Sequence, residues 1–212
     1  MRPEKFYANS TYHVCSTGIE SVDLFADEID CTRFIFLATH LQSPIRMHNV
    51  FWYVDSYKKR GAFLAGENKQ KEILKNRNVE LLAFALTQNS FDLVIKNLEE
   101  MALSVYMQRL LTGYSKYYNA KYKRSGHVFS GVFRSKQIKS ETDLLSTSAV
   151  IHKKPFSKQS PAGKLGGHRW SSHTDYTDHN RWGDLLNTKE ILGIFKNPGD
   201  YKKFVMGHDT ES

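Results

Sequence analysis

The spacing of hydrophobic residues predicts strands and helices that follow one another along the chain. Residues 12–15 form a β-type run closed by a Thr-Gly pair, which indicates a first strand. Apolar residues then recur at helical spacing within 27–41, after an acidic pair suited to a first turn, and the Ser-Pro pair at 43–44 should end this helix. Residues 79–87 are apolar enough for a central strand, and residues 91–95 should return beside it as an antiparallel partner.

The second half of the chain continues in the same way. A long helix should carry one apolar stripe from residue 103 to about residue 122, and residues 128–138 alternate like another strand. Ser140 is suited to cap a helix over 141–153, which Pro155 should end. This order of elements predicts an α+β fold, with one central antiparallel sheet and helices packed on a face.

Two regions fit this pattern less well. Residues 45–78 resemble an insertion, in which 47–54 could form a strand and 58–78 has weak helical character. Residues 156–185 form a polar stretch rich in Ser, Gly, His and Trp, which indicates a loop region. Trp170 is the residue expected to anchor the C-terminal segment to the sheet domain.

The chain should close with two short helices. Residues 187–190 have capping-box spacing, and the Asn-Pro pair at 197–198 places proline where a helix can begin. We therefore expect one domain over 1–185, which contains the insertion, and a helical extension over 186–212 that packs on it.

Composition narrows the class of protein. The chain has 212 residues, of which 40 % are hydrophobic, with a formal charge of +8 and a pI of about 9.3. Such a charge favours an acidic partner, nucleic acid first. Cys15 and Cys31 are too few for a disulfide framework or a zinc site of their own, so free thiols in a reducing cytoplasm are expected. The longest apolar stretch, residues 81–86, is too short to cross a membrane.

The charge is concentrated between Leu103 and Lys139, a stretch that has no acidic residue. Its eight cations are the predicted nucleic-acid contacts: Arg109, Lys116, Lys121, Lys123, Arg124, Arg134, Lys136 and Lys139. Seven aromatic residues lie among them: Tyr106, Tyr114, Tyr117, Tyr118, Tyr122, Phe129 and Phe133. Cations mixed with aromatic rings suit phosphates and unstacked bases. The alternative is that most of these rings are core residues and the cations form a solvated face.

Several short motifs occur in a fixed order around this stretch. The central ones are Met107-Gln108-Arg109-Leu110-Leu111, Tyr114, Tyr118-Asn119, Arg124-Ser125-Gly126-His127-Val128-Phe129 and Gly131-Val132-Phe133-Arg134-Ser135. Outside them lie Tyr12-His13-Val14, Val150-Ile151-His152, Trp170-Ser171-Ser172 and Ile191-Leu192. Together these motifs closely resemble the single-tyrosine HUH transposases, most of all the REP-associated tyrosine transposase branch. The resemblance covers most of the chain outside residues 45–78.

The resemblance implies a ferredoxin-like sandwich and an activity that cuts and rejoins single-stranded DNA, guided by hairpins. In that family a His-hydrophobic-His motif on a central strand holds Mg²⁺ or Mn²⁺, and an Asn or Gln completes the metal shell. A tyrosine on a nearby helix attacks the phosphorus. The metal neutralises developing charge while the phenolate acts as nucleophile.

This chain departs from the family at all four chemical positions. The two histidine positions hold Ser90 and Asp92, the nucleophile position holds Val150, and the Asn position holds Lys154. No catalytic residue is therefore intact, and we expect no metal cofactor. The resemblance instead predicts that Asp92 and Lys154 face each other where the family holds its ion. The expected function is that of a catalytically inactive transposase-like protein that binds hairpin or single-stranded DNA.

Two rival functions remain open. One is an active transposase that uses displaced residues, for instance Asp92 and Ser90 as weak Mg²⁺ ligands and one of the helix tyrosines Tyr114, Tyr117, Tyr118 or Tyr122 as nucleophile. The other is a module that binds structured RNA or a protein on the same fold.

The histidines carry weaker signals. His13, His127 and His152 occupy family-like positions, where we expect structural hydrogen bonds. His168, His173 and His179, with Asp175 and Asp178, lack regular ligand spacing and are expected in a solvated loop.

Overall fold

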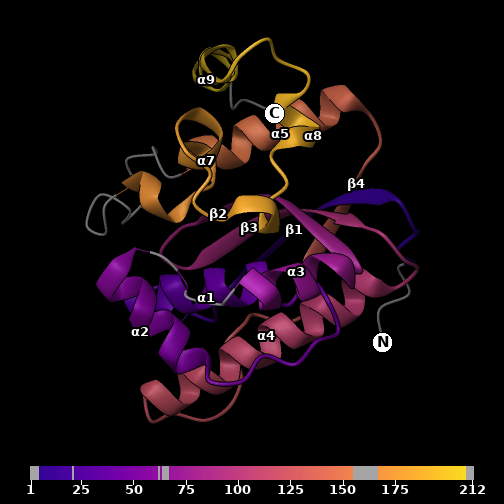
Figure 1. The fold of residues 1–212 in the computed structure, drawn as a ribbon. Coiled ribbons are helices and arrows are strands. Elements are labelled where there is room, and N and C mark those ends of the chain that lie inside the picture. Colours follow the sequence, from indigo (N-terminus) through magenta and orange to yellow (C-terminus); the bar gives the residue numbers. More distant parts are fainter. Residues whose placement is uncertain (1–4, 21, 62, 64–66, 155–166, 209–212) are drawn as a thin grey trace.

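A four-stranded antiparallel sheet forms the centre of the molecule (Figure 1). The computed structural model describes residues 5–20, 22–61, 63, 67–154 and 167–208. The strands are β1 (Ser10–Thr17), β2 (Val79–Leu86), β3 (Ser90–Asn97) and β4 (Arg134–Ile138), in the spatial order β2-β3-β1-β4. The predicted α+β class with one antiparallel sheet is therefore confirmed.

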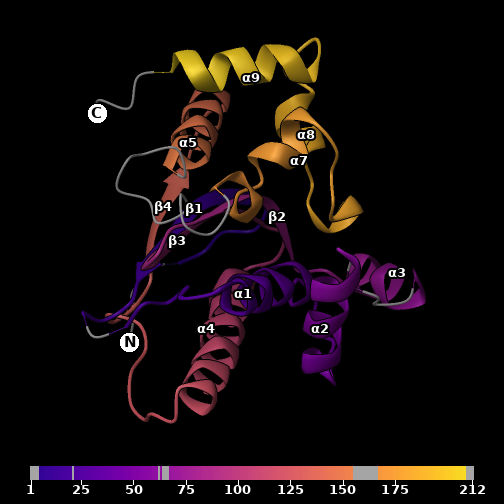
Figure 2. The ribbon, with the colours of Figure 1, turned by 90° about the vertical axis from the view of Figure 1, so that its left-hand side faces the viewer.

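One face of this sheet packs against α1 (Glu28–His40) and the long helix α4 (Ala102–Lys121), as Figure 1 shows below the sheet. Helix α2 (Val50–Arg60) packs against α1, and α3 (Glu67–Lys75) lies beyond α2 on the same side of the sheet (Figure 2). Phe34, Leu110 and Tyr114 from the helices meet Phe91 and Leu93 from β3 in the larger hydrophobic core. We call this side of the sheet the α4 face.

The opposite face carries the last third of the chain (Figure 2). Helix α5 (Glu141–Lys153) lies over the sheet together with α7 (His173–Thr177), α8 (Lys189–Leu192) and α9 (Pro198–Gly207). The short 3-10 segments η2 (Gly167–Trp170) and η3 (Gly183–Leu185) connect them. A second, smaller core joins these helices to β2 and β3. Helices thus cover both faces, and we call this side the α5 face.

A bulge in β2 places two consecutive side chains of this strand in the same core. The pairing with β3 shifts between Leu81 and Ala83, so that Leu82 is the extra residue. Leu81 and Phe84 belong to the core on the α4 face, whereas Leu82 and Ala83 belong to the core on the α5 face. Such a bulge changes which side chains point to each face.

The predicted helix starts agree with the observed caps. Asp27 caps α1 through a reciprocal capping box with Asp30. Ser140 caps α5 by accepting a hydrogen bond from the backbone of Asp143. Asn197 caps α9, with proline in the first turn as predicted. Pro155, expected to end α5, lies outside the described residues.

The strand predicted over 47–54 is wrong, because this segment begins α2. Its run of aromatic and β-branched residues resembles a strand, but Val54 and Tyr57 are buried at helical spacing. Gly61 ends the helix in a left-handed conformation, with φ of 71°. Packing against the rest of the protein outweighs local strand propensity here.

The strand predicted over 128–138 is shorter than expected. Only Arg134–Ile138 pairs with β1, whereas Phe129 forms an isolated bridge to Gly18. Gly131 has φ of 86°, which interrupts extended backbone before the strand starts.

Two expectations for the C-terminal third also need correction. The described part of 156–185 is built from short helices rather than open loop. The capping box at 187–190 does not form: Thr188 holds the N-cap position of α8 without a side-chain cap hydrogen bond, and the Glu190 carboxylate bonds Lys96 instead. Trp170 is buried as predicted, and the adjoining Ser171 bridges to Ala85 of β2.

None of the described helices combines the length and the apolar composition that crossing a membrane requires.

Candidate functional site

Asp92 lies in the middle of β3 and points toward the α5 face. Its neighbours Phe91 and Leu93 belong to the core on the α4 face, and alternation along a strand sends Asp92 the other way. Its side chain is only 1 % exposed. A carboxylate this deeply buried needs partners, because removing a charge from water is costly.

Two cationic or polar groups supply these partners. Lys154, at the end of α5, donates to Oδ1 and Oδ2 of Asp92 at 2.7 Å each. Nε2 of His13 on β1 donates to Oδ1 at 2.8 Å, since an ionised carboxylate can only accept. The predicted contact between Asp92 and Lys154 is confirmed.

These contacts keep Asp92 ionised. Burial alone would raise the pKa of the Asp92 carboxyl, but the hydrogen bond from His13 and the charge and hydrogen bond of Lys154 outweigh it, so the pKa is lowered. The buried charge is thus satisfied by protein groups from two other elements.

The pairing of the strands extends this site across the sheet. Cys15 of β1 stands opposite Asp92 on one side and opposite Arg134 of β4 on the other. Two residues earlier on β1, His13 stands opposite Lys136. Residues opposite each other in an antiparallel pair share a face, so all five side chains belong to the α5 face.

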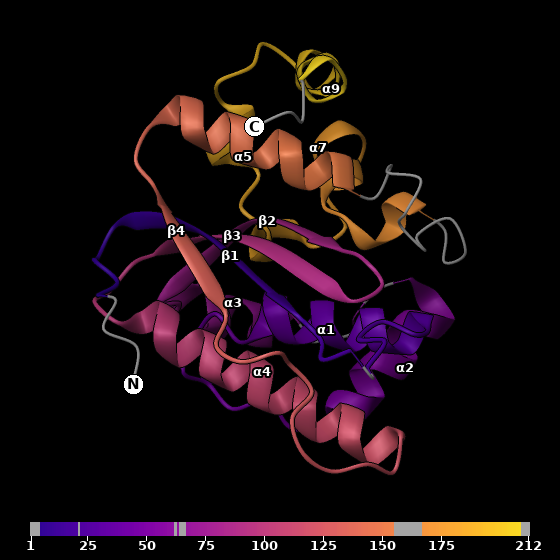
Figure 3. The ribbon, with the colours of Figure 1, turned by 180° about the vertical axis from the view of Figure 1, so that it is seen from behind.

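Arg134 and Lys136 are exposed and have no ion-pair partner within the part of the chain that the structure describes. They are two residues apart and lie on the same side of β4, which places them about 7 Å apart along the strand. In Figure 3, β4 runs along an edge of the sheet from the side of α4 up to α5. We call Arg134, Lys136 and Lys154 the β4 cation group.

Two of the eight predicted nucleic-acid contacts are structural instead. The Arg109 guanidinium donates to the backbone carbonyls of Leu41, Ser43 and Ile45. It therefore fixes the chain that leaves α1, and it is not available to bind phosphate.

Lys121 is the second. Its ammonium bonds Asp27 at 2.6 Å and the buried Asp30 at 2.7 Å. Burial would lower the pKa of Lys121, but these two carboxylates and the Tyr122 hydroxyl raise it overall. The acidic partners lie on α1, far from this residue in sequence, so the local absence of acids was misleading.

The remaining cations of the stretch do not form one surface with the β4 cation group. Lys116 lies on α4, on the other side of the sheet from Asp92. Lys123 follows the end of α4 with φ of 50°. The Arg124 side chain donates to the backbone of His127 and stacks near Tyr118, 5.8 Å from its ring centre.

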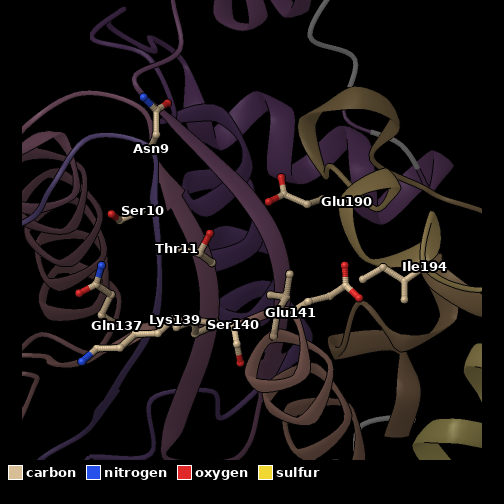
Figure 4. Close-up of a pocket in the computed structure, with 11 residues that line it drawn as sticks. Asn9, Ser10, Thr11, Gln137, Lys139, Ser140, Glu141, Glu190 and Ile194 are labelled. Atoms are coloured by element: carbon tan, nitrogen blue, oxygen red, sulfur yellow. The ribbon is translucent and has the colours of Figure 1, made fainter.

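Lys139 lies at the rim of a polar pocket of about 500 Å³ at the far end of β1 and β4. Figure 4 shows Glu190 and Glu141 beside this pocket and the Lys139 side chain directed away from them. Glu141 and the Glu190 carboxylate, which pairs with Lys96, give this end of the α5 face a mixed charge, in contrast to the end that carries Arg134.

The aromatic residues of the basic stretch are mainly core residues. Tyr106, Tyr114 and Tyr118 are at most 5 % exposed and donate their hydroxyls to backbone carbonyls of α1 or the chain before it. Phe129 and Phe133 are also buried. They do not form an open platform for bases, so this part of the prediction is wrong.

None of the tyrosines proposed as displaced nucleophiles is near Asp92. Tyr114, Tyr117, Tyr118 and Tyr122 all lie on or just after α4, on the opposite side of the sheet. Burial raises the pKa of Tyr114 well above its ordinary value, which disfavours the reactive phenolate.

The family's metal positions do not fit Mg²⁺ in this chain. Ser90 shares a hydrogen bond of 2.7 Å with the side chain of Thr87. Lys154 holds both oxygens of Asp92, so a positive charge already lies beside this carboxylate. Val150, one helical turn before Lys154, offers no nucleophile.

Two other donors beside Asp92 were not recognised as a group from the sequence. His13 and Cys15 alternate on β1 and, with Asp92, bring three potential metal-ligand atoms within 4.8 Å of one another. The His-x-Cys spacing on a strand was a usable signal, but its partner lies 77 residues after Cys15. Both cysteines are free thiols, as predicted.

The histidines behave mainly as structural residues. His152 is fully buried and bonds the Tyr201 hydroxyl at 2.6 Å and the Ser172 hydroxyl at 2.7 Å, as expected. Asp175 is not a solvated loop residue: it is buried and pairs with Arg181 at 2.7 Å. His173 is buried as well.

A scan of protein-family models found no match to this chain, and neither the curated proteins nor the solved structures gave one.

Proposed function

We propose that this protein binds hairpin or single-stranded DNA over the β4 cation group and does not cut the bound strand. The observation that carries the proposal is the state of the charges around Asp92. Lys154 and His13 hydrogen-bond the oxygens of Asp92. Arg134 and Lys136, on the neighbouring strand β4, are exposed and have no ion-pair partner among the described residues. A site of this kind retains net positive charge toward solvent and attracts phosphate.

The arrangement of elements supports the likeness to HUH transposases drawn from the motifs. Helix α1 follows β1, the hairpin of β2 and β3 comes next, and α4 leads to β4. With the order β2-β3-β1-β4, this arrangement agrees with the connectivity expected of a ferredoxin-like sandwich, which supports the proposal.

A bound strand would run along β4. Arg134 and Lys136 lie about 7 Å apart on one side of the strand, a spacing that suits neighbouring phosphates of an extended chain. Such contacts position a nucleic acid without reading its bases. The hairpin preference rests on the family resemblance.

Absence of cleavage follows from the same residues. The position that would carry the nucleophile holds Val150, and Lys154 neutralises the Asp92 carboxylate, which makes it unsuited to a hard cation such as Mg²⁺. The tyrosines of α4 are separated from Asp92 by the sheet itself.

Binding is tested by fluorescence anisotropy with a DNA hairpin that has a single-stranded tail, compared with duplex DNA and an RNA hairpin of the same sequence. Measurements at several salt concentrations give the slope of log affinity against log salt. We expect the DNA hairpin to bind best, and Arg134→Ala with Lys136→Ala to reduce the magnitude of that slope by about 1 for each cation removed.

The matched control is Lys58→Ala with Arg60→Ala, which removes the same charges from α2 and should leave hairpin affinity unchanged. Equal hairpin affinity of the wild type and the Arg134/Lys136 variant at moderate salt would contradict our placement of the DNA-binding surface along β4. Preference for the RNA hairpin would favour the rival RNA-binding function, and a covalent DNA adduct formed with Mn²⁺ would favour an active transposase.

A further inference from the structure

Three donor atoms of different chemistry converge on the α5 face beside Lys154. They are an imidazole nitrogen of His13, the thiol sulfur of Cys15 and a carboxylate oxygen of Asp92, all within 4.8 Å of one another. We propose that His13, Cys15 and Asp92 bind one Zn²⁺ ion. This inference goes beyond the proposed function and does not depend on whether the protein binds DNA.

The sheet holds the three donors in place. His13 and Cys15 alternate on β1, so both point to the α5 face. Asp92 is the direct partner of Cys15 in the pairing of β1 with β3. Donors fixed on two paired strands lose little freedom when they bind a metal, which favours a site of defined geometry.

The type of donor selects the metal. Thiolate, imidazole and carboxylate together suit Zn²⁺, whereas Mg²⁺ prefers oxygen donors alone. Three protein ligands also leave a fourth position for water, as in open zinc sites. The site shares only Asp92 with the Ser90, Asp92 and Lys154 positions of the transposase pattern, which do not fit a hard cation.

Protons and charges balance on binding. The Cys15 thiol releases its proton to solvent, and the proton that His13 Nε2 donates to Asp92 in the free protein is exchanged for one on Nδ1, so that Nε2 is free to bind. Oδ1 of Asp92 exchanges its hydrogen bonds with His13 and Lys154 for the metal, while Oδ2 keeps its hydrogen bond with Lys154. Thiolate and carboxylate together match the two charges of the ion, and the Lys154 ammonium leaves one positive charge beside the site.

The donors are also reachable from solvent. The His13 side chain is 25 % exposed and Cys15 is partly exposed, although Asp92 is buried. The other cysteine provides a natural comparison, because Cys31 is 1 % exposed inside the core on the α4 face. A metal that reaches Cys15 from water cannot reach Cys31 in the folded protein.

The test is a titration of the reduced, chelator-treated full chain with Co²⁺, which replaces Zn²⁺ spectroscopically, in the absence of DNA. We expect a thiolate-to-cobalt charge-transfer band at one equivalent, displaced by Zn²⁺. Cys15→Ser should abolish the band, Cys31→Ala should retain it, and His13→Gln should weaken Co²⁺ binding by more than about tenfold.

Lys154 provides an independent variant. Its positive charge lies next to the site, so Lys154→Met should tighten Co²⁺ binding by at least about tenfold. The proposal is overturned if the wild type shows no such band, even if Lys154→Met does, because the lysine then excludes the metal. It is equally overturned if the band survives Cys15→Ser. DNA affinity is measured separately, so failure of the metal site leaves the proposed function untouched.

Discussion

Lys154 joins the end of α5 to the middle of β3 by bonding both carboxylate oxygens of Asp92 at 2.7 Å. The two partners differ in their surroundings, because the lysine side chain is 38 % exposed and the carboxylate 1 %. The lysine can return to water when its partner is removed, but the carboxylate cannot. Loss of Lys154 should therefore cost more than the surface position of its ammonium suggests.

A double-mutant cycle measures this pair. Lys154→Met leaves the buried Asp92 with His13 alone, and we expect unfolding free energy to fall by about 1–3 kcal/mol. Asp92→Ala combined with Lys154→Met should show a coupling energy of about 1 kcal/mol or more in urea unfolding. Lys139→Met, at an exposed position, is the control for loss of charge. Unchanged stability in both single variants and in the double variant would exclude a structural role for the pair.

Acid should destabilise the fold well above the range in which carboxylates titrate. Burial lowers the pKa of His40 from 6.5 to about 4, although a hydrogen bond to the Phe36 carbonyl acts in the other direction. The unfolded chain therefore takes up a proton below pH 6.5 that the folded chain refuses until about pH 4. Stability is full above pH 6.5 and falls as pH decreases through this window, by about 3 kcal/mol from this residue.

Unfolding free energies measured between pH 7.5 and 4 should accordingly show a shallower decline in His40→Leu than in the wild type. An identical decline in both proteins would mean that His40 is already protonated in the fold or exposed in solution. His152, which is also buried and also has a lowered pKa, should sustain part of the slope in the variant.

Arg109 should matter for stability and not for binding. Its guanidinium donates hydrogen bonds to three backbone carbonyls between Leu41 and Ile45. Arg109→Ala should therefore destabilise the protein by about 1–3 kcal/mol. Lys116→Ala on the exposed side of the same helix should change stability by less than about 0.5 kcal/mol. Thermal unfolding of the two variants decides between these roles. A stable Arg109→Ala protein with weakened hairpin binding would restore Arg109 as a nucleic-acid contact.

Gly18 should tolerate no side chain. Its backbone nitrogen donates to the carbonyl of Asn89 at 2.9 Å, and an added Cβ would collide with the Asn89 side chain and come within 3.0 Å of Leu24 and of the Val22 carbonyl. Gly18→Ala should cost about 1–3 kcal/mol, measured by urea unfolding. Gly207→Ala, where nothing lies within 4 Å, should behave like the wild type in the same experiment.

Local patterns predicted the order of the elements well, because the signals that start and end a helix or a strand come from residues close together in sequence. The caps by Asp27, Ser140 and Asn197 illustrate this: cap and capped group lie within three residues of each other. The contact of Asp92 with Lys154 came from a different source, the alignment of two distant motifs with one family pattern.

The failures share a physical cause, which is pairing between distant parts of the chain. Lys121 looked unpaired because its stretch has no acids, yet Asp27 and Asp30 lie more than 90 residues earlier. Residues 47–54 were interpreted as a possible strand, but Val54 and Tyr57 are buried at helical spacing in α2. Composition within a window cannot reveal such partners.

The place of β4 at the border of the sheet has a consequence for any attempt to neutralise its charges. An outermost strand offers unpaired backbone groups to other chains, and lysine or arginine side chains on it discourage self-association. Arg134 and Lys136 are both exposed on this short strand. Removing them together should make the protein more prone to aggregate, so dispersity measured by light scattering belongs beside every affinity determined with that variant.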